Sequence, residues 1–104
     1  MSRTIAIGRM ALTACDNCIE KHYAGQPFHY ETITKLNITK IGSYFTSFYD
    51  VEMESYSGPM YGSYTFLKEE LKDLRKFLKE NYDIKMILLE RKTVSIKIGK
   101  LLDN

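Results

Sequence analysis

The chain has 104 residues, of which 44% are hydrophobic and 27% charged, and its formal net charge is +2. This length predicts one domain over residues 1–104, and the composition excludes a disordered chain. The small charge does not by itself indicate nucleic-acid binding, no apolar run reaches the ~18 residues of a membrane-spanning helix, and two cysteines exclude a disulfide scaffold. Arg9 interrupts the first apolar stretch, so we expect no secretion signal and a cytoplasmic protein.

The N-terminal quarter predicts a short strand followed by a helix. Residues 3–7 contain threonine and isoleucine and fit a strand. Over residues 10–23, small and apolar side chains recur at every fourth position, and this spacing predicts a helix. The residues on its expected buried face are Met10, Ala14 and Cys18. A glycine at position 25 and a proline at position 27 are typical of a helix end.

Two strands are predicted in the middle of the chain. Residues 30–38 are rich in threonine and isoleucine, and a turn follows near residues 40–42. Residues 43–54 alternate, and the face predicted to meet the core contains Phe45, Ser47, Tyr49, Val51 and Met53. The opposite face contains Tyr44, Thr46, Phe48, Asp50, Glu52 and Glu54. Residues 57–62 predict a loop because they hold two glycines and a proline, and residues 63–66 form either a short strand or the approach to a helix.

The C-terminal part predicts a helix and two strands. Residues 66–81 carry leucines at positions 67, 71, 74 and 78, which is an amphipathic pattern, and Thr65 is the expected N-terminal cap. Residues 83–90 and 93–99 predict strands, and the apolar run at 87–89 favours a strand covered on both sides. In the last strand, alternation predicts one buried face formed by Val94, Ile96 and Ile98. The predicted order is (β)αββαββ, an α+β fold with a mostly antiparallel sheet and two helices.

All cysteine and histidine residues of the chain lie within fifteen consecutive positions, and they are Cys15, Cys18, His22 and His29. Two thiolates and two imidazoles form the ligand set of a tetrahedral structural zinc. The sequence therefore predicts a small zinc-bound subregion near the N-terminus. In a variant of this site, Asp16, Glu20 or water replaces one histidine. A zinc with four protein ligands has no open position, so it would stabilise the fold without taking part in catalysis.

Three other interpretations of these residues stay open. The cysteines can be small buried residues of a core helix, with both histidines at the surface. They can also form a redox dithiol, although the gap between the first predicted strand and Cys15 is long for that arrangement. A catalytic cysteine–histidine pair is the third alternative, and it lacks any local sequence signature here.

A second group of candidate residues is the cluster of aromatic, acidic and loop side chains between positions 44 and 64. Tyrosine, serine and glycine together are common at protein-binding surfaces, and exposed aromatics beside carboxylates suit a basic partner. The predicted partner-binding residues are Tyr44, Phe48, Asp50, Glu52, Glu54, Tyr56, Met60, Tyr61 and Tyr64. The alternative is that the tyrosines pack on the sheet and the acids only keep an edge strand from aggregating. An exposed edge here would also allow a homodimer.

The absence of a phosphate loop, a dinucleotide fingerprint or a serine–histidine–aspartate set predicts a non-enzymatic protein-binding module. In general character the chain is similar to accessory proteins of phages and mobile elements, including small inhibitors of bacterial defence nucleases such as anti-CRISPR proteins. It is short, rich in lysine, isoleucine and tyrosine, and without a catalytic motif. That similarity implies an inhibitor that sterically occupies a partner in the cytoplasm of a host cell.

The competing hypothesis is a nucleic-acid-binding zinc domain. Residues 1–65 contain 5 basic and 6 acidic residues, whereas residues 66–104 contain 10 basic and 7 acidic ones, so positive charge gathers in the C-terminal part. Phosphate contacts would then come from Lys72, Arg75, Lys76, Lys79, Lys85, Arg91, Lys92 and Lys97. The alternative for these side chains is an ordinary solvated face.

Overall fold

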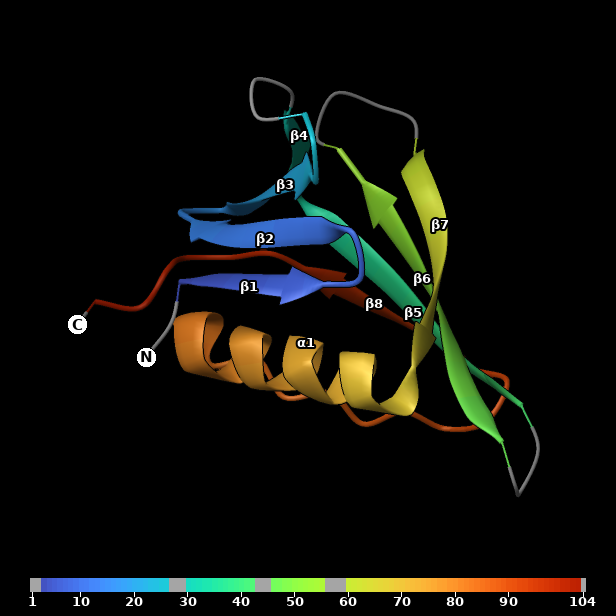
Figure 1. The fold of residues 1–104 in the computed structure, drawn as a ribbon. Coiled ribbons are helices and arrows are strands. Elements are labelled where there is room, and N and C mark those ends of the chain that lie inside the picture. The colour runs from blue at the N-terminus through green and yellow to red at the C-terminus, as the bar shows by residue number, and fades with distance from the viewer. Residues whose placement is uncertain (1–2, 27–29, 43–45, 56–59, 104) are drawn as a thin grey trace.

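The computed structural model describes residues 3–26, 30–42, 46–55 and 60–103. In these residues the chain forms two four-stranded antiparallel sheets and one helix (Figure 1). The first sheet has the order β1-β2-β3-β4, with bounds Thr4–Ile7, Met10–Cys15, Cys18–Tyr23 and Tyr30–Ile33. The second has the order β7-β6-β5-β8, with bounds Met60–Leu67, Ser47–Glu54, Lys35–Gly42 and Thr93–Lys97. The helix α1 spans Lys68–Tyr82.

The prediction of a helix over residues 10–23 is wrong, because these residues form the β2–β3 hairpin. In β2 every second side chain is buried, beginning with Met10. A spacing of four residues returns to the same face in a strand as well as in a helix, so the recurring small and apolar residues fitted both structures. Two residues join the strands, and the second of them, Asn17, has a φ of 64°, which asparagine tolerates better than most residues. The α+β class therefore holds with one helix in the described residues, not two.

The segment predicted as one strand over residues 30–38 belongs to both sheets. Only Thr34 separates β4 from β5. Its backbone N–H donates to the carbonyl of Glu54 at 2.8 Å, and its carbonyl accepts from the N–H of Ile98 at 2.8 Å. The main chain therefore stays hydrogen-bonded where it passes from the first sheet into the second, and the consecutive strands β4 and β5 join the two sheets.

The alternation predicted for residues 43–54 is confirmed within the described part of β6. Tyr49, Val51 and Met53 are buried, and the residues between them are partly exposed. Tyr44 and Phe45 lie outside the described residues. Residues 63–66 belong to β7, so they form a strand that leads directly into α1.

The helix predicted over residues 66–81 is confirmed, with its start shifted by two residues. Its buried face includes Leu71, Leu74 and Leu78. The expected cap at Thr65 is wrong, because Thr65 lies within β7 and the N-cap position is Leu67. The backbone N–H of Leu67 donates to Glu70 Oε1 at 2.9 Å, so a carboxylate from the first turn caps the helix. The helix is not long and apolar enough to cross a membrane, and it is the only helix in the described residues.

The core lies between α1 and the inner faces of the two sheets. In Figure 1 the helix runs along β1 and meets the end of β7, while the second sheet curves away on the other side. Side chains from all three parts share one buried cluster, and its fully enclosed members include Ile33, Ile38, Val51, Leu74 and Leu78. The outer face of the second sheet carries partly exposed and exposed side chains on all four strands.

The prediction of a doubly covered strand over residues 83–90 is wrong. The segment is extended and runs alongside α1 (Figure 1), but its only ladder contact among the described residues is a single bridge between Glu90 and Lys40. Met86 is buried, whereas Ile87 is 80% exposed and Leu89 is 58% exposed. Side chains of this segment thus face the core and the solvent in turn, and apolar residues occupy both the buried and the exposed positions. The final predicted strand is confirmed as β8, although it ends at Lys97. Ile96 and Ile98 are buried as predicted, and Val94 is partly buried.

Candidate functional site

A fully buried lysine occupies the inner face of the first sheet. Lys21 in β3 has no exposed surface, and its cross-strand neighbours are Leu12 in β2 and Glu31 in β4. Lys21 Nζ lies 2.8 Å from Glu31 Oε2, so the buried ammonium has a carboxylate partner on the adjacent strand. Burying an ammonium without such a partner costs several kcal/mol, so the buried Lys21 requires the carboxylate of Glu31.

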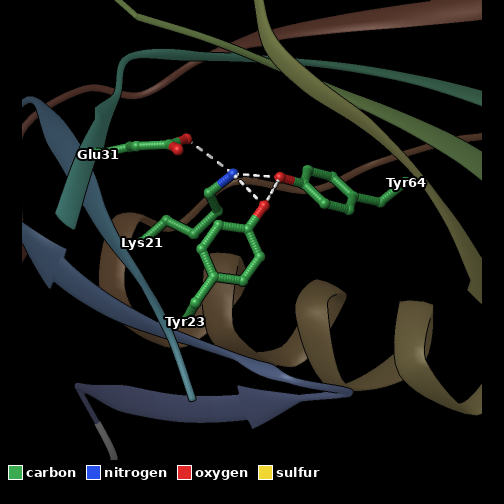
Figure 2. A network of polar contacts seen from close by, with 4 residues as sticks. All are labelled: Lys21, Tyr23, Glu31 and Tyr64. Carbon is green, nitrogen blue, oxygen red and sulfur yellow. Dashed lines mark hydrogen bonds and ion pairs between the residues drawn. The ribbon is translucent and has the colours of Figure 1, made fainter. Parts of the chain in front are cut away.

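Two tyrosine hydroxyls complete the surroundings of Lys21. Figure 2 shows the Nζ atom between Glu31, Tyr23 and Tyr64. It donates to the Tyr23 hydroxyl at 3.2 Å and contacts the Tyr64 hydroxyl, and the two hydroxyls also contact each other. Tyr64 comes from β7, so the cluster links the first sheet to the second. A Cβ at Gly62 would approach the Tyr64 hydroxyl oxygen to 2.8 Å, so glycine leaves the space that this ring needs.

The electrostatics of the cluster keep Lys21 charged. Burial lowers the pKa of Lys21, but hydrogen bonds to Glu31, Tyr64 and Tyr23 outweigh it, and the pKa is raised above its usual value. Burial raises the pKa of Tyr64, so its phenol stays neutral. A permanently protonated amine is not a nucleophile. The adjoining cavity is about 100 Å³, smaller than the ~300 Å³ or more of typical ligand pockets, so the cluster serves as a structural link between the sheets.

The two cysteines lie side by side at the end of the β2–β3 hairpin. Cys15 and Cys18 are directly opposite each other, and the Tyr82 hydroxyl at the end of α1 lies 2.9 and 2.8 Å from their carbonyl oxygens. That hydroxyl also accepts from the N–H of Cys15 at 3.0 Å. The N–H of Asn17 donates to the carbonyl of Gly99 at 2.9 Å. The helix end and the C-terminal segment therefore both hold this turn in place.

The described residues do not bring the predicted zinc ligands together. His22 is four residues along β3 from Cys18, which in a strand is a separation of about 13 Å. The His22 ring instead lies 3.6 Å from a carboxylate oxygen of Glu20 and 5.6 Å, centre to centre, from the ring of Tyr30. His29 lies outside the described residues. Within the described part of the chain, no group of three or more histidine, cysteine and acidic residues is arranged to hold a metal.

Both thiols are held in the protonated form. Burial, the negative charge of Glu20 and the neighbouring Cys18 raise the pKa of Cys15 to about 11. Burial is also the main cause that raises the pKa of Cys18. Redox and catalytic cysteines need a lowered pKa, since the thiolate is the reactive form. The surroundings of this pair therefore do not favour the redox and catalytic interpretations.

The structure places four of the predicted partner-binding residues on one surface. Phe48, Asp50, Glu52 and Glu54 alternate along the outer face of β6. Tyr64 lies on the opposite, inner face of the same sheet, where it contacts Lys21. Tyr44, Tyr56 and the side chains of Met60 and Tyr61 lie outside the described residues.

An apolar row crosses one end of this outer face. In the strand register Ile41 is opposite Phe48, and Phe48 is opposite Leu67, so three apolar side chains from β5, β6 and β7 lie next to one another. Leu67 is 63% exposed and Ile41 is 36% exposed. The sequence pattern placed Leu67 on the leucine face of the helix, which is wrong, because Leu67 ends β7 and is exposed. Ile41 was not singled out, because the register that joins both residues to Phe48 is a property of the fold.

Beyond the apolar row, the outer side chains of these strands are polar, and several of them form hydrogen bonds across neighbouring strands. Ser63 Oγ donates to Asp50 Oδ1 at 2.7 Å, and Ser95 Oγ donates to Asn37 Oδ1 at 2.7 Å. Glu54 contacts Asn37 and lies 4.0 Å from the ammonium of Lys35. Within the described residues Glu52 has no hydrogen bond or ion pair. We call the side chains of β5, β6, β7 and β8 that point away from the core the outer face. This face has an apolar end, and it carries carboxylates of which Glu52 has no partner among the described residues.

Three basic residues of the competing hypothesis, Arg75, Lys79 and Lys85, line one groove between α1 and the segment after it. The others are spread over α1, the following turn and β8. Lys76 lies 4.0 Å from Glu80, and Lys79 pairs with Asp83. Comparison with protein-family models, curated proteins and solved structures found no match to the chain.

Proposed function

We propose that the protein is a non-enzymatic protein-binding module that acts by sterically occupying a partner through the outer face. The observation that carries this proposal is the cross-strand row of Ile41, Phe48 and Leu67 on a sheet face that none of the described helices and strands covers. Exposed apolar residues in contact with one another mark protein interfaces more often than scattered ones do. The proposal does not require zinc, because the outer face belongs to the second sheet and the cysteine pair to the first.

The charge of the outer face indicates the chemistry of the partner. Asp50, Glu52 and Glu54 follow the apolar row along β6, and one of them has no partner among the described side chains. Carboxylates beside an apolar patch suit a basic surface with an apolar centre. Nucleases present such basic surfaces to nucleic acid. We therefore keep an inhibitor of a bacterial defence nuclease, of the anti-CRISPR kind, as the proposed class.

The test is co-purification with defence nucleases, followed by calorimetric titration of each pair that forms. Leu67→Asp and Glu52→Arg should each weaken binding about tenfold or more. The matched control is Tyr30→Ser, because Tyr30 is 57% exposed on the first sheet and its loss should not change the affinity. Unchanged affinity in both outer-face variants would contradict the proposal. Retention on heparin that moderate salt abolishes, without any nuclease bound, would favour nucleic-acid binding instead.

A further inference from the structure

The segment that follows α1 is an extended stretch of chain with an unpaired backbone. Its ends are fixed, because the N–H of Ile84 donates to the carbonyl of Leu78 at 3.2 Å and the N–H of Arg91 donates to the carbonyl of Lys40 at 3.1 Å. Between them, the N–H and carbonyl groups of residues 85–88 make no hydrogen bond within the described part of the chain. Extended backbone with free donors and acceptors is a template for another strand.

Apolar side chains on this segment face the solvent. Ile87 is 80% exposed and Leu89 is 58% exposed, while Met86, which precedes Ile87, is 4% exposed and holds the segment on the core. Figure 1 shows the segment running alongside α1 on the outside of the molecule. Two exposed side chains at a spacing of two point to the same side of an extended chain, as the side chains of a strand do. The segment therefore offers both the backbone and the side-chain pattern of an edge strand.

A basic groove lies between this segment and the helix. It has a volume of about 360 Å³, and its lining combines apolar side chains with cationic ones: Arg75, Lys79, Ile84, Lys85, Met86 and Ile87. Lys79 pairs with Asp83, but Arg75 and Lys85 make no ion pair within the described residues. The apolar lining suits alternate side chains of an added strand, and the two cations suit carboxylates between them.

We propose that residues 84–89 and the adjoining groove bind an extended acidic peptide of a partner protein by strand addition. Main-chain hydrogen bonds to residues 85–88 would supply affinity, contacts with Ile87 would bury its exposed side chain, and Arg75 and Lys85 would select carboxylates. Charge complementarity makes the occupant an acidic peptide. This surface is built from other elements than the outer face, so the inference does not rest on the function proposed above.

The test uses a fluorescent seven-residue peptide of alternating valine and glutamate, with a valine–lysine peptide as the matched probe. The protein should bind the glutamate peptide and not the lysine peptide, as measured by fluorescence anisotropy. Hydrogen exchange followed by NMR should show fast exchange at residues 85–88 in the free protein and protection about tenfold stronger when the peptide is bound. Ile87→Asp, and Arg75→Glu combined with Lys85→Glu, should each weaken binding about tenfold or more.

The control variant is Tyr30→Ser, which changes an exposed tyrosine of the first sheet and should leave peptide binding unchanged. Circular dichroism checks that each variant is folded. Equal binding of both peptides, or no protection at residues 85–88, would overturn the proposal. A dimer in size-exclusion chromatography that Ile87→Asp dissociates would also overturn it, because a second copy of the chain would then occupy the segment.

Discussion

β3 and β5 are both interior strands with one face against the shared core, yet they bury different chemistry. β5 places Ile38 between Val51 and Val94, whereas β3 places Lys21 between Leu12 and Glu31. The aliphatic group needs only apolar contact, which is not directional. The ammonium needs acceptors at fixed positions, and it takes them from β4, β3 and β7. The difference shows that a charge can be buried in this core only where several strands supply partners.

A lysine placed at the equivalent position of β5 should therefore prevent folding. Ile38→Lys would bury an ammonium whose cross-strand neighbours are valines, and we expect a loss of about 4 kcal/mol or more in the free energy of unfolding. Thr39→Lys on the outer face of the same strand is the matched control and should change stability by about 0.5 kcal/mol or less. Urea unfolding followed by circular dichroism measures the stability of both variants. Equal losses in the two variants would show that burial of the ammonium is not the cause of the destabilisation.

Removing the carboxylate partner of Lys21 should have the next largest effect. Glu31→Gln leaves the buried ammonium without its anion, and we expect a loss of about 3 kcal/mol. Lys21→Met should stay within about 1 kcal/mol of the wild type, because an apolar side chain of similar length needs no partner. In the double variant the cost of Glu31→Gln should largely disappear. Strictly additive losses would contradict the pairing.

The contribution of Lys21 should also depend on pH. Because its pKa is raised by folding, the stabilisation is fully present below the ordinary pKa of lysine, ~10.4, and is lost as pH rises through the higher folded value. The difference in unfolding free energy between the wild type and Lys21→Met should therefore be constant near neutral pH and change only in strong alkali. A change between pH 5 and pH 8 would show that another group is responsible.

The Tyr82 hydroxyl should contribute less than the charged pair. Tyr82→Phe removes the hydroxyl that bridges the carbonyls of Cys15 and Cys18 and leaves those groups with fewer partners. We expect a loss of about 1–2 kcal/mol, with the ring still packed near Phe77. Thermal unfolding measures it. A loss as large as that of Glu31→Gln would mean that the hairpin turn depends on this hydroxyl more than its geometry indicates.

The smallest effect concerns thiol reactivity. Because the pKa of Cys15 is about 11 in the folded chain against 9.0 ordinarily, its stabilising contribution is present below pH 9 and is lost as pH rises toward 11. In Cys18→Ser protein the rate of reaction with a thiol reagent should level off at a higher pH when folded than the value near pH 9 in urea, because burial and Glu20 still raise the pKa of Cys15. Identical pH profiles in both states would contradict the raised pKa.

The sequence predicted the elements whose periodicity is long and unambiguous. Burial in β6 alternates from Phe48 to Glu54, and the fifteen residues of α1 carry a regular leucine pattern. The β2–β3 hairpin was mistaken for a helix because its strands are six residues each and the spacing from Met10 to Cys18 fits both periods. Residues 83–90 were wrongly predicted as a strand covered on both sides, because apolar side chains occupy both the buried and the exposed positions of this segment.

The candidate surfaces were predictable only in part. Phe48, Asp50 and Glu52 follow from the alternation of β6, but Ile41 and Leu67 join them through strand register. Lys21 was missed because a helix was predicted for this segment. In a strand every second side chain lies on the same face, so Lys21 shares the buried face of Ile19. Its partner Tyr64 is 43 residues away in sequence, and no local pattern connects the two.

Hydroxyl-radical footprinting of the chain in complex with a nuclease that co-purifies with it tests the central claim most directly. We predict that Phe48 and Leu67 are protected from oxidation in the complex, while Tyr30, 57% exposed on the first sheet, is oxidised as in the free protein. Protection of Tyr30 with Leu67 still reactive would contradict a binding role for the outer face. Protection of Ile87 alone would indicate that the segment after α1, and not the outer face, contacts the nuclease.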